Sequence, residues 1–224
     1  MDMVLDEYKD RQEDIDMLVS LISSLKEGNK LIVVDENNEA ISEMQINEDL
    51  INILKSVIYV MCYNQVESTV RGCVETIYDH LEDTCTGYNE LKVSIQKELL
   101  HSVLKIYETG GSLHKKVGNE LELKLPKASF QIRRIFNGNV SKRTMNELTR
   151  VYGITITADP KDLNLLKEAR NELAHGNASF SQYGRKDTVD DCVSISSRVS
   201  SYLSTMIHCF DEYIVNKYYL CSQN

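Results

Sequence analysis

The sequence has few of the residues that interrupt helices, with two prolines and ten glycines among 224 residues. Proline breaks helix interiors and glycine weakens them, so long stretches of this chain are free to be helical. It also lacks any apolar run near the roughly 20 residues that a membrane-spanning helix needs. The acidic segment 1–16 is the opposite of a basic, then apolar, signal peptide. We therefore expect a mostly α-helical, cytoplasmic protein that does not contact a membrane.

Metal-binding and disulfide patterns are also missing. The six cysteines form no CxxC pair, and the five histidines form no HxxxH or HExxH pair. A metal knuckle or a disulfide framework would need close spacing of these residues in loops. We expect free thiols in a reducing cytosol, no dedicated metal site and no cofactor.

Acidic residues are in excess, with a formal net charge of −9, but the charge is unevenly divided. Residues 1–109 carry 22 acidic and 9 basic side chains, whereas residues 110–150 carry 3 and 9. This basic segment could hold RNA phosphates while the overall field discourages indiscriminate binding. A merely solvated surface is the alternative that charge alone leaves open. The candidate RNA-binding residues are Lys115, Lys116, Arg133, Arg134, Lys142 and Arg143, with Arg185 further along the chain.

The apolar spacing predicts helices over residues 3–27, 49–81 and 88–107. Residues 30–34 and 39–41 flank Asp-Glu-Asn-Asn and predict a short β-hairpin. We expect residues 1–48 to form an N-terminal helix and hairpin extension, and residues 49–224 to form one helical domain.

Capping residues predict three more helices. Ser141 caps a helix that Gly153 stops, and Asp159-Pro160 begins a second one, which ends near His175-Gly176. Thr188 with Asp191 opens a helix that continues to about residue 220. The long helices would form the spine of a bundle.

A cation and a titratable ring occur close together in Arg170-Asn171-Glu172-Leu173-Ala174-His175. A histidine that titrates near neutral pH can take a proton from a ribose 2′-OH or return one to the leaving 5′-oxygen. An arginine offers a fork of donors to the non-bridging phosphate oxygens as charge develops. Five positions apart on an ideal helix, however, the two side chains diverge by about 140°. They converge if the last turn loosens, or if two chains combine their copies.

This segment resembles the HEPN signature, in which Arg is followed by Asn, Asp or His, then three residues, then His; Arg170, Asn171 and His175 fill its places. The flanking sequence resembles a bacterial branch of HEPN nucleases found among defence and toxin genes. The similarity runs through residues 63–71, 77–79, 138–140, 152–154, 174–176, 179–180, 184–185, 188 and 212–214.

The resemblance implies a HEPN-like helical bundle that acts as a homodimer and cleaves RNA without a metal, leaving a 2′,3′-cyclic phosphate. It implies His175 as the acid and base, Arg170 as the phosphate clamp and Asn171 as the residue that orients them. It also implies a toxin or antiphage-defence effector that is restrained by an antitoxin or another defence-system protein. HEPN toxins that are silenced by nucleotide transfer carry a Tyr two residues after the histidine, and this chain has Asn177 at that position. We therefore do not expect silencing by that route.

Other interpretations stay open. Asn64, Glu67 and Arg71 lie on one face of the long helix. Glu67 and Arg71 either assist Arg170 and His175 in catalysis or belong to a polar network that only fixes helix packing. The whole chain could instead be a non-catalytic HEPN-like module that binds a partner protein or a nucleotide. A DNA-cleaving enzyme is less favoured, because the sequence shows no carboxylate cluster for a metal.

Overall fold

The structure is a computed structural model, and it describes residues 1–25, 30–34, 36, 40–108 and 139–221. The chain divides into two compact units, each assembled from separate segments. Unit 1 comprises Met1–Leu5, Glu67–Pro160 and Tyr202–Asn224, and unit 2 comprises Asp6–Val66 and Lys161–Ser201. The predicted division into residues 1–48 and 49–224 stays a prediction.

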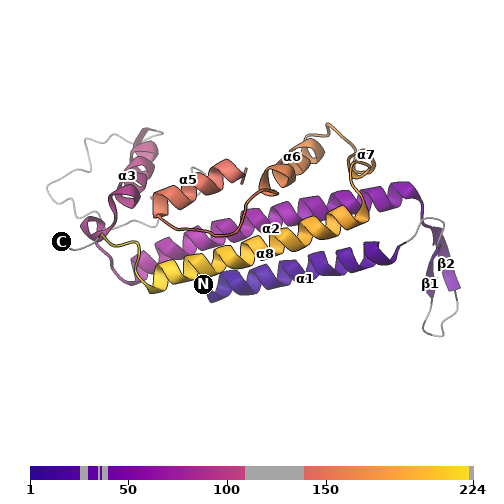
Figure 1. Cartoon of the computed structure of the whole chain (residues 1–224), viewed down its shortest axis with the longest axis horizontal. Helices are drawn as coiled ribbons and strands as arrows, with labels where there is room; N and C mark the ends of the chain where they lie inside the picture. Colours follow the sequence, from indigo (N-terminus) through magenta and orange to yellow (C-terminus); the bar gives the residue numbers. More distant parts are fainter. Residues whose placement is uncertain (26–29, 35, 37–39, 109–138, 222–224) are drawn as a thin grey trace. The chain divides into compact units, whose positions relative to one another are not determined.

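The described part of the chain is mostly helical, which confirms the expected fold class (Figure 1). Its seven α-helices are α1 (Asp2–Ser24), α2 (Glu48–Asp83), α3 (Val93–Glu108), α5 (Lys142–Tyr152), α6 (Leu163–Ala174), α7 (Phe180–Gly184) and α8 (Val189–Val215). Helices α1, α2 and α8 each contribute residues to both units. None of the helices in the described ranges is long and apolar enough to cross a membrane.

Residues 30–45 contain two strands, β1 (Lys30–Val34) and β2 (Ala40–Gln45), which pair antiparallel with an irregularity between Val33 and Val34. The second strand was expected at residues 39–41, so its observed extent to Gln45 corrects the sequence-based bounds. The reason is that Gln45 and Met44 pair with Lys30 and Leu31 at the start of β1, a register that a single sequence does not reveal. Residues 35 and 37–39, where the turn was expected, lie outside the described residues.

Unit 1 is built around buried tyrosines. The hydroxyls of Tyr78 and Tyr152 are hydrogen-bonded at 2.9 Å, and Tyr213 meets the Tyr152 ring edge-on at a centroid separation of 6.4 Å. Helix α3 begins at Val93 instead of the predicted residue 88. The chain just before it pairs with the C-terminal segment instead, because the Lys92 amide donates to the Tyr219 carbonyl at 2.9 Å. Sequence periodicity cannot reveal such a distant partner.

The predicted capping residues are confirmed at α5 and α8. Ser141 accepts a hydrogen bond from the Thr144 amide at the start of α5, and Gly153 ends that helix with φ +70°. Thr188 and Asp191 form the expected reciprocal pair at the start of α8. Helix α6 begins later than predicted, with Asp162 at its N-cap. The Asp162 carboxylate accepts two hydrogen bonds from Arg198, and it makes no cap hydrogen bond to its own helix.

In unit 2, the segment between α6 and α8 is fixed to the N-terminal half of α2. The buried Ser56 hydroxyl donates to the Phe180 carbonyl at 2.6 Å, and Tyr59 donates to the Asp187 carboxylate at 2.8 Å. The buried Lys55 ammonium donates to the Asp187 carbonyl at 2.7 Å. Figure 1 shows α6 and α7 beside α2 accordingly. These contacts hold the connection that follows the Arg170–His175 segment.

Gly184 makes the closest approach between α7 and α2, since a Cβ at this position would overlap the Asn52 backbone carbonyl. We predict that Gly184→Ala lowers the free energy of unfolding by about 2–3 kcal/mol, because a backbone atom cannot rotate away as a side chain can. The melting temperature should fall by about 5–10 °C, as measured by circular dichroism. Gly87→Ala is the matched control, because its Cβ would meet only Glu90 at ordinary contact distance. Equal melting temperatures for the two variants would contradict this close packing.

Candidate active site

The last turn of α6 holds His175 in a defined backbone position. His175 is the C-cap, with φ −90° and ψ 0°, and Gly176 follows in the left-handed conformation at φ +70°. The Asn177 amide donates to the Glu172 carbonyl at 2.9 Å, and the Gly176 amide donates to the Leu173 carbonyl at 3.3 Å. This pair of hydrogen bonds is a Schellman motif, which needs a residue without Cβ strain at the left-handed position. The prediction that the helix ends at His175-Gly176 is confirmed.

Arg170 lies on the same helix and is half-buried. Its Nη1 donates to the Asn171 side-chain carbonyl at 3.1 Å, and its Cζ lies 5.6 Å from the ring centroid of Tyr63. Tyr63 is fully buried on α2, so its ring offers a fixed face to the guanidinium. Asn171 and Tyr63 therefore both contact the Arg170 guanidinium, and sequence reasoning did not assign the contact with Tyr63. The catalytic role of Asn171 stays a prediction.

The His175 side chain is exposed. Among the described residues, none forms a hydrogen bond or ion pair with its ring. Arg170 is held against Tyr63, whereas the imidazole is free to meet a ligand from solvent. Neither side chain is fully buried in the packed core.

Downstream of His175, a small charged cluster fixes α7. The Asp49 carboxylate accepts hydrogen bonds from the Ser181 hydroxyl at 2.6 Å and from the Arg185 guanidinium at 2.9 Å. The Ser181 hydroxyl, and after it Arg185, hold the pKa of Asp49 below its ordinary value, so the carboxylate stays charged at neutral pH. Arg185, a predicted RNA-binding residue, is thus more than half exposed but already paired with an acid.

The predicted assisting residues Glu67 and Arg71 form an ion pair with each other at 3.2 Å, one turn apart on α2. Glu67 is half-buried and Arg71 is exposed. Both belong to unit 1, whereas Arg170, Asn171 and His175 belong to unit 2. Their assistance to the catalytic pair stays a prediction.

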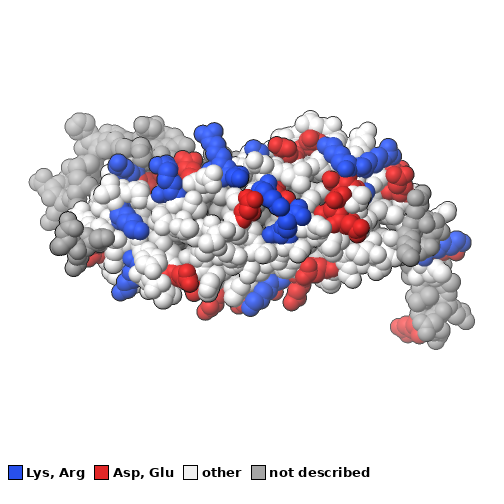
Figure 2. Space-filling model, viewed as in Figure 1, with Lys and Arg blue, Asp and Glu red and all other residues white. Residues whose placement is uncertain are grey.

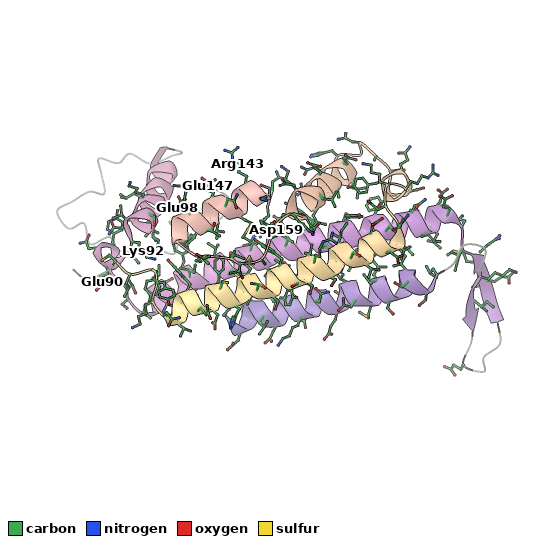
Figure 3. All side chains as sticks on the ribbon, viewed as in Figure 1. Glu90, Lys92, Glu98, Arg143, Glu147 and Asp159 are labelled. Atoms are coloured by element: carbon green, nitrogen blue, oxygen red, sulfur yellow. The ribbon has the colours of Figure 1, made fainter. Side chains whose placement is uncertain are left out.

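Most of the predicted basic segment lies outside the described residues, including Lys115, Lys116, Arg133 and Arg134. Lys142 and Arg143 are exposed on α5, and Lys142 lies 3.9 Å from the Asp159 carboxylate. Figure 3 shows Arg143 and Glu147 on the same helix, where they are one turn apart. Over the face drawn in Figure 2, basic and acidic side chains alternate. In the described part of this segment, Lys142 is therefore already close to a carboxylate.

The six cysteines are free, as expected, and Cys62, Cys73 and Cys192 are buried. Burial raises the pKa of Cys62 to about 12 and that of Cys192 to about 11. Buried thiols with such values stay protonated at neutral pH and are poor nucleophiles. Within the described ranges, no three His, Cys, Asp or Glu side chains are grouped so that they could hold a metal ion.

Sequence reasoning gave no role to three residues near the candidate site, Tyr63, Phe180 and Asp187, although Tyr63 and Phe180 belong to the segments that carry the resemblance. Tyr63 and Asp187 act through contacts with residues 107 and 128 positions away, which a single sequence does not reveal. Phe180 directly follows the capping Ser179 and begins a helix five positions beyond His175.

A comparison of the chain with known protein families finds a match to one family. Residues 2–219 match the family described as "HEPN_MAE_28990:/-like HEPN". No curated protein and no solved structure matches the chain significantly. The match covers nearly the whole chain, including both units. The protein therefore belongs to this HEPN family.

Proposed function

We propose that this protein is a HEPN endoribonuclease that cleaves RNA through the ribose 2′-OH without a metal ion. The observation that carries the proposal is the end of α6, where a supported guanidinium and an exposed imidazole occur within six residues. Family membership adds support, since HEPN domains are commonly ribonucleases.

The proposed reaction needs only two kinds of side chain. The 2′-oxygen attacks the neighbouring phosphorus, the P–O5′ bond breaks, and the product carries a 2′,3′-cyclic phosphate. An imidazole removes the 2′-OH proton, and a protonated imidazole gives a proton to the leaving 5′-oxygen. The Arg170 guanidinium stabilises the charge that develops on the non-bridging oxygens, while Asn171 and Tyr63 hold its fork in place.

Two chains would complete this site in our proposal. Arg170 is directed to the Tyr63 face of α2, whereas His175 leaves the helix at its cap. A two-fold dimer would bring Arg170 of one copy to His175 of the other in each of two equivalent clefts. In each cleft the same His175 imidazole takes the 2′-OH proton and, once protonated, gives a proton to the leaving 5′-oxygen. The dimer also accounts for a site assembled from side chains that diverge on their own helix.

The biological role that we propose is that of a toxin or antiphage-defence effector, restrained by a partner protein. An RNA endonuclease of this kind damages its own cell, so expression without the restraining partner should slow growth. Residues Lys142, Arg143 and Arg185 are proposed to contact RNA phosphates. Lys142 and Arg185 would exchange their present carboxylate partners for phosphates, and Arg143 is exposed on α5.

We predict that the purified protein cleaves single-stranded RNA in the presence of EDTA at the rate seen without it. The nucleophile belongs to the substrate, so the reaction has no step that needs a metal-bound water. Mass spectrometry of the products should find 2′,3′-cyclic phosphate and 5′-hydroxyl ends. RNA whose ribose 2′-OH at the cleavage site is replaced by hydrogen should resist cleavage. Loss of activity in EDTA, or 5′-phosphate ends, would contradict the mechanism.

The second candidate is a non-catalytic module that binds a partner protein or a nucleotide. It is favoured by the net charge of −9 and by the acids that pair with the described basic residues. Expression of the protein alone separates the two functions, because a binding module should be tolerated by the host cell.

A further inference from the structure

The connection between α6 and α8 presents one exposed aromatic ring close to His175 in sequence. Residues 161–201 are all described, and Phe180 is the large apolar side chain exposed among them, at 38%. More than a third of this residue is therefore accessible to solvent, while the rest is covered. A partly covered aromatic residue of this kind can offer apolar surface to a ligand without leaving its place in the fold.

The backbone around this ring is held on both sides. The Ser56 hydroxyl donates to the Phe180 carbonyl at 2.6 Å, and Ser179 and Gln182 form a reciprocal capping pair. The next residues are fixed as well, because Tyr183 is buried and meets the Tyr59 ring edge-on at 5.7 Å. A side chain carried on a fixed backbone loses less freedom on binding than one carried on a mobile loop, so its contact contributes more to affinity.

Phe180 is also near the place where the scissile phosphate is proposed to lie. It lies five positions after His175, so their Cα atoms are at most about 18 Å apart. That distance is within the reach of a few nucleotides of a single strand. The exposed side chains between them, Asn177 and Ser179, are polar. Two cations follow α7, Arg185 paired with Asp49 and Lys186 paired with Glu172, and about half of each cationic side chain is exposed.

We propose that Phe180 is a base-stacking residue, which binds a nucleobase of single-stranded RNA beside the scissile phosphate. This inference rests on the proposed ribonuclease function and names the substrate class as unpaired RNA. Aromatic rings bind unpaired bases by stacking, and a base inside a duplex cannot offer its face. A second copy of the chain fits the ring less well, because a protein interface buries about 800 Å² per partner around an apolar centre. The exposed neighbours of Phe180 are instead Asn177, Ser179, Gln182 and Arg185.

The sequence contains no tryptophan, which gives a direct test. Phe180→Trp in a His175→Ala background introduces a single indole next to uncleaved RNA. Adding single-stranded RNA of about a dozen nucleotides should quench the indole emission, with the same Kd as a filter-binding assay. The matched control is Tyr218→Trp in the same background, at a side chain of unit 1 that is 56% exposed, and its emission should not change. Circular dichroism confirms that both variants are folded.

A second variant measures the contribution to binding. Phe180→Ser should weaken the binding of single-stranded RNA about tenfold or more, and should leave the binding of duplex RNA unchanged. The stacking inference is overturned if the indole at 180 does not respond while RNA is bound, or if no RNA is bound. It is also overturned if its emission changes with protein concentration in the absence of RNA, which would indicate contact between copies. Quenching by RNA together with an absence of cleavage by the wild-type protein would support stacking and refute the ribonuclease function.

Discussion

Replacement of His175 by alanine is expected to lower RNA cleavage by about 100- to 10,000-fold, which is the usual contribution of a positioned acid or base. His175 is exposed and its ring has no partner among the described residues, so its removal takes no contact from the fold. The melting temperature should therefore stay at the wild-type value. The measurement is the single-turnover cleavage rate of a labelled RNA, and the growth defect of cells that express the protein should disappear with it.

The matched control for this variant is His208→Ala. His208 is also exposed and lies on a helix, 3.7 Å from the Glu212 carboxylate, but it is distant in sequence from the motif. Its replacement should leave both cleavage and growth arrest unchanged. Full activity of the His175→Ala protein would refute the assignment of His175, whereas loss of activity in both variants would point to a general effect on the protein.

Local chemistry made the helices predictable from sequence. Ser141 and Gly153 bound α5, Thr188 opens α8 and Gly176 ends α6, because each satisfies backbone groups that a helix end leaves unpaired. The starts of α3 and α6 were misplaced for the opposite reason. Lys92 pairs with Tyr219, and Asp162 is held by Arg198, so distant partners decide where these two helices begin.

The candidate site was predictable only in its sequence-local part. Arg170, Asn171 and His175 form a recognisable motif, and the hydrogen bond from Arg170 to Asn171 joins neighbouring residues. Tyr63 is different, because its contact with Arg170 requires that α2 and α6 pack together. The predicted RNA-binding cations could be counted from the sequence. Their carboxylate partners, such as Asp49 for Arg185, could not be.

Arg170→Lys is expected to lower kcat by about 100-fold or more, with a smaller change in KM. Lysine keeps the positive charge but lacks the planar fork that can bind two phosphate oxygens together. It also lacks the flat guanidinium that lies over the Tyr63 ring, so the charge is less well placed. Arg11→Lys is the control, because Arg11 is a partly exposed residue of α1 whose partner among the described residues is Glu7 on its own helix. The activity of this variant should be unchanged. Full activity of Arg170→Lys would show that charge alone is sufficient.

A mixture of two inactive variants tests whether Arg170, the phosphate clamp, and His175, the acid and base, come from different chains of the dimer. Arg170→Ala and His175→Ala chains, mixed after unfolding and refolding, would form half of their dimers from unlike chains. If each cleft takes Arg170 from one copy and His175 from the other, one of the two clefts in every mixed dimer is complete. About a quarter of the wild-type rate should return, because the two-fold axis makes the clefts equivalent. If both groups act within one chain, mixing restores nothing, and the proposed dimeric cleft is refuted while the assignment of the two residues remains.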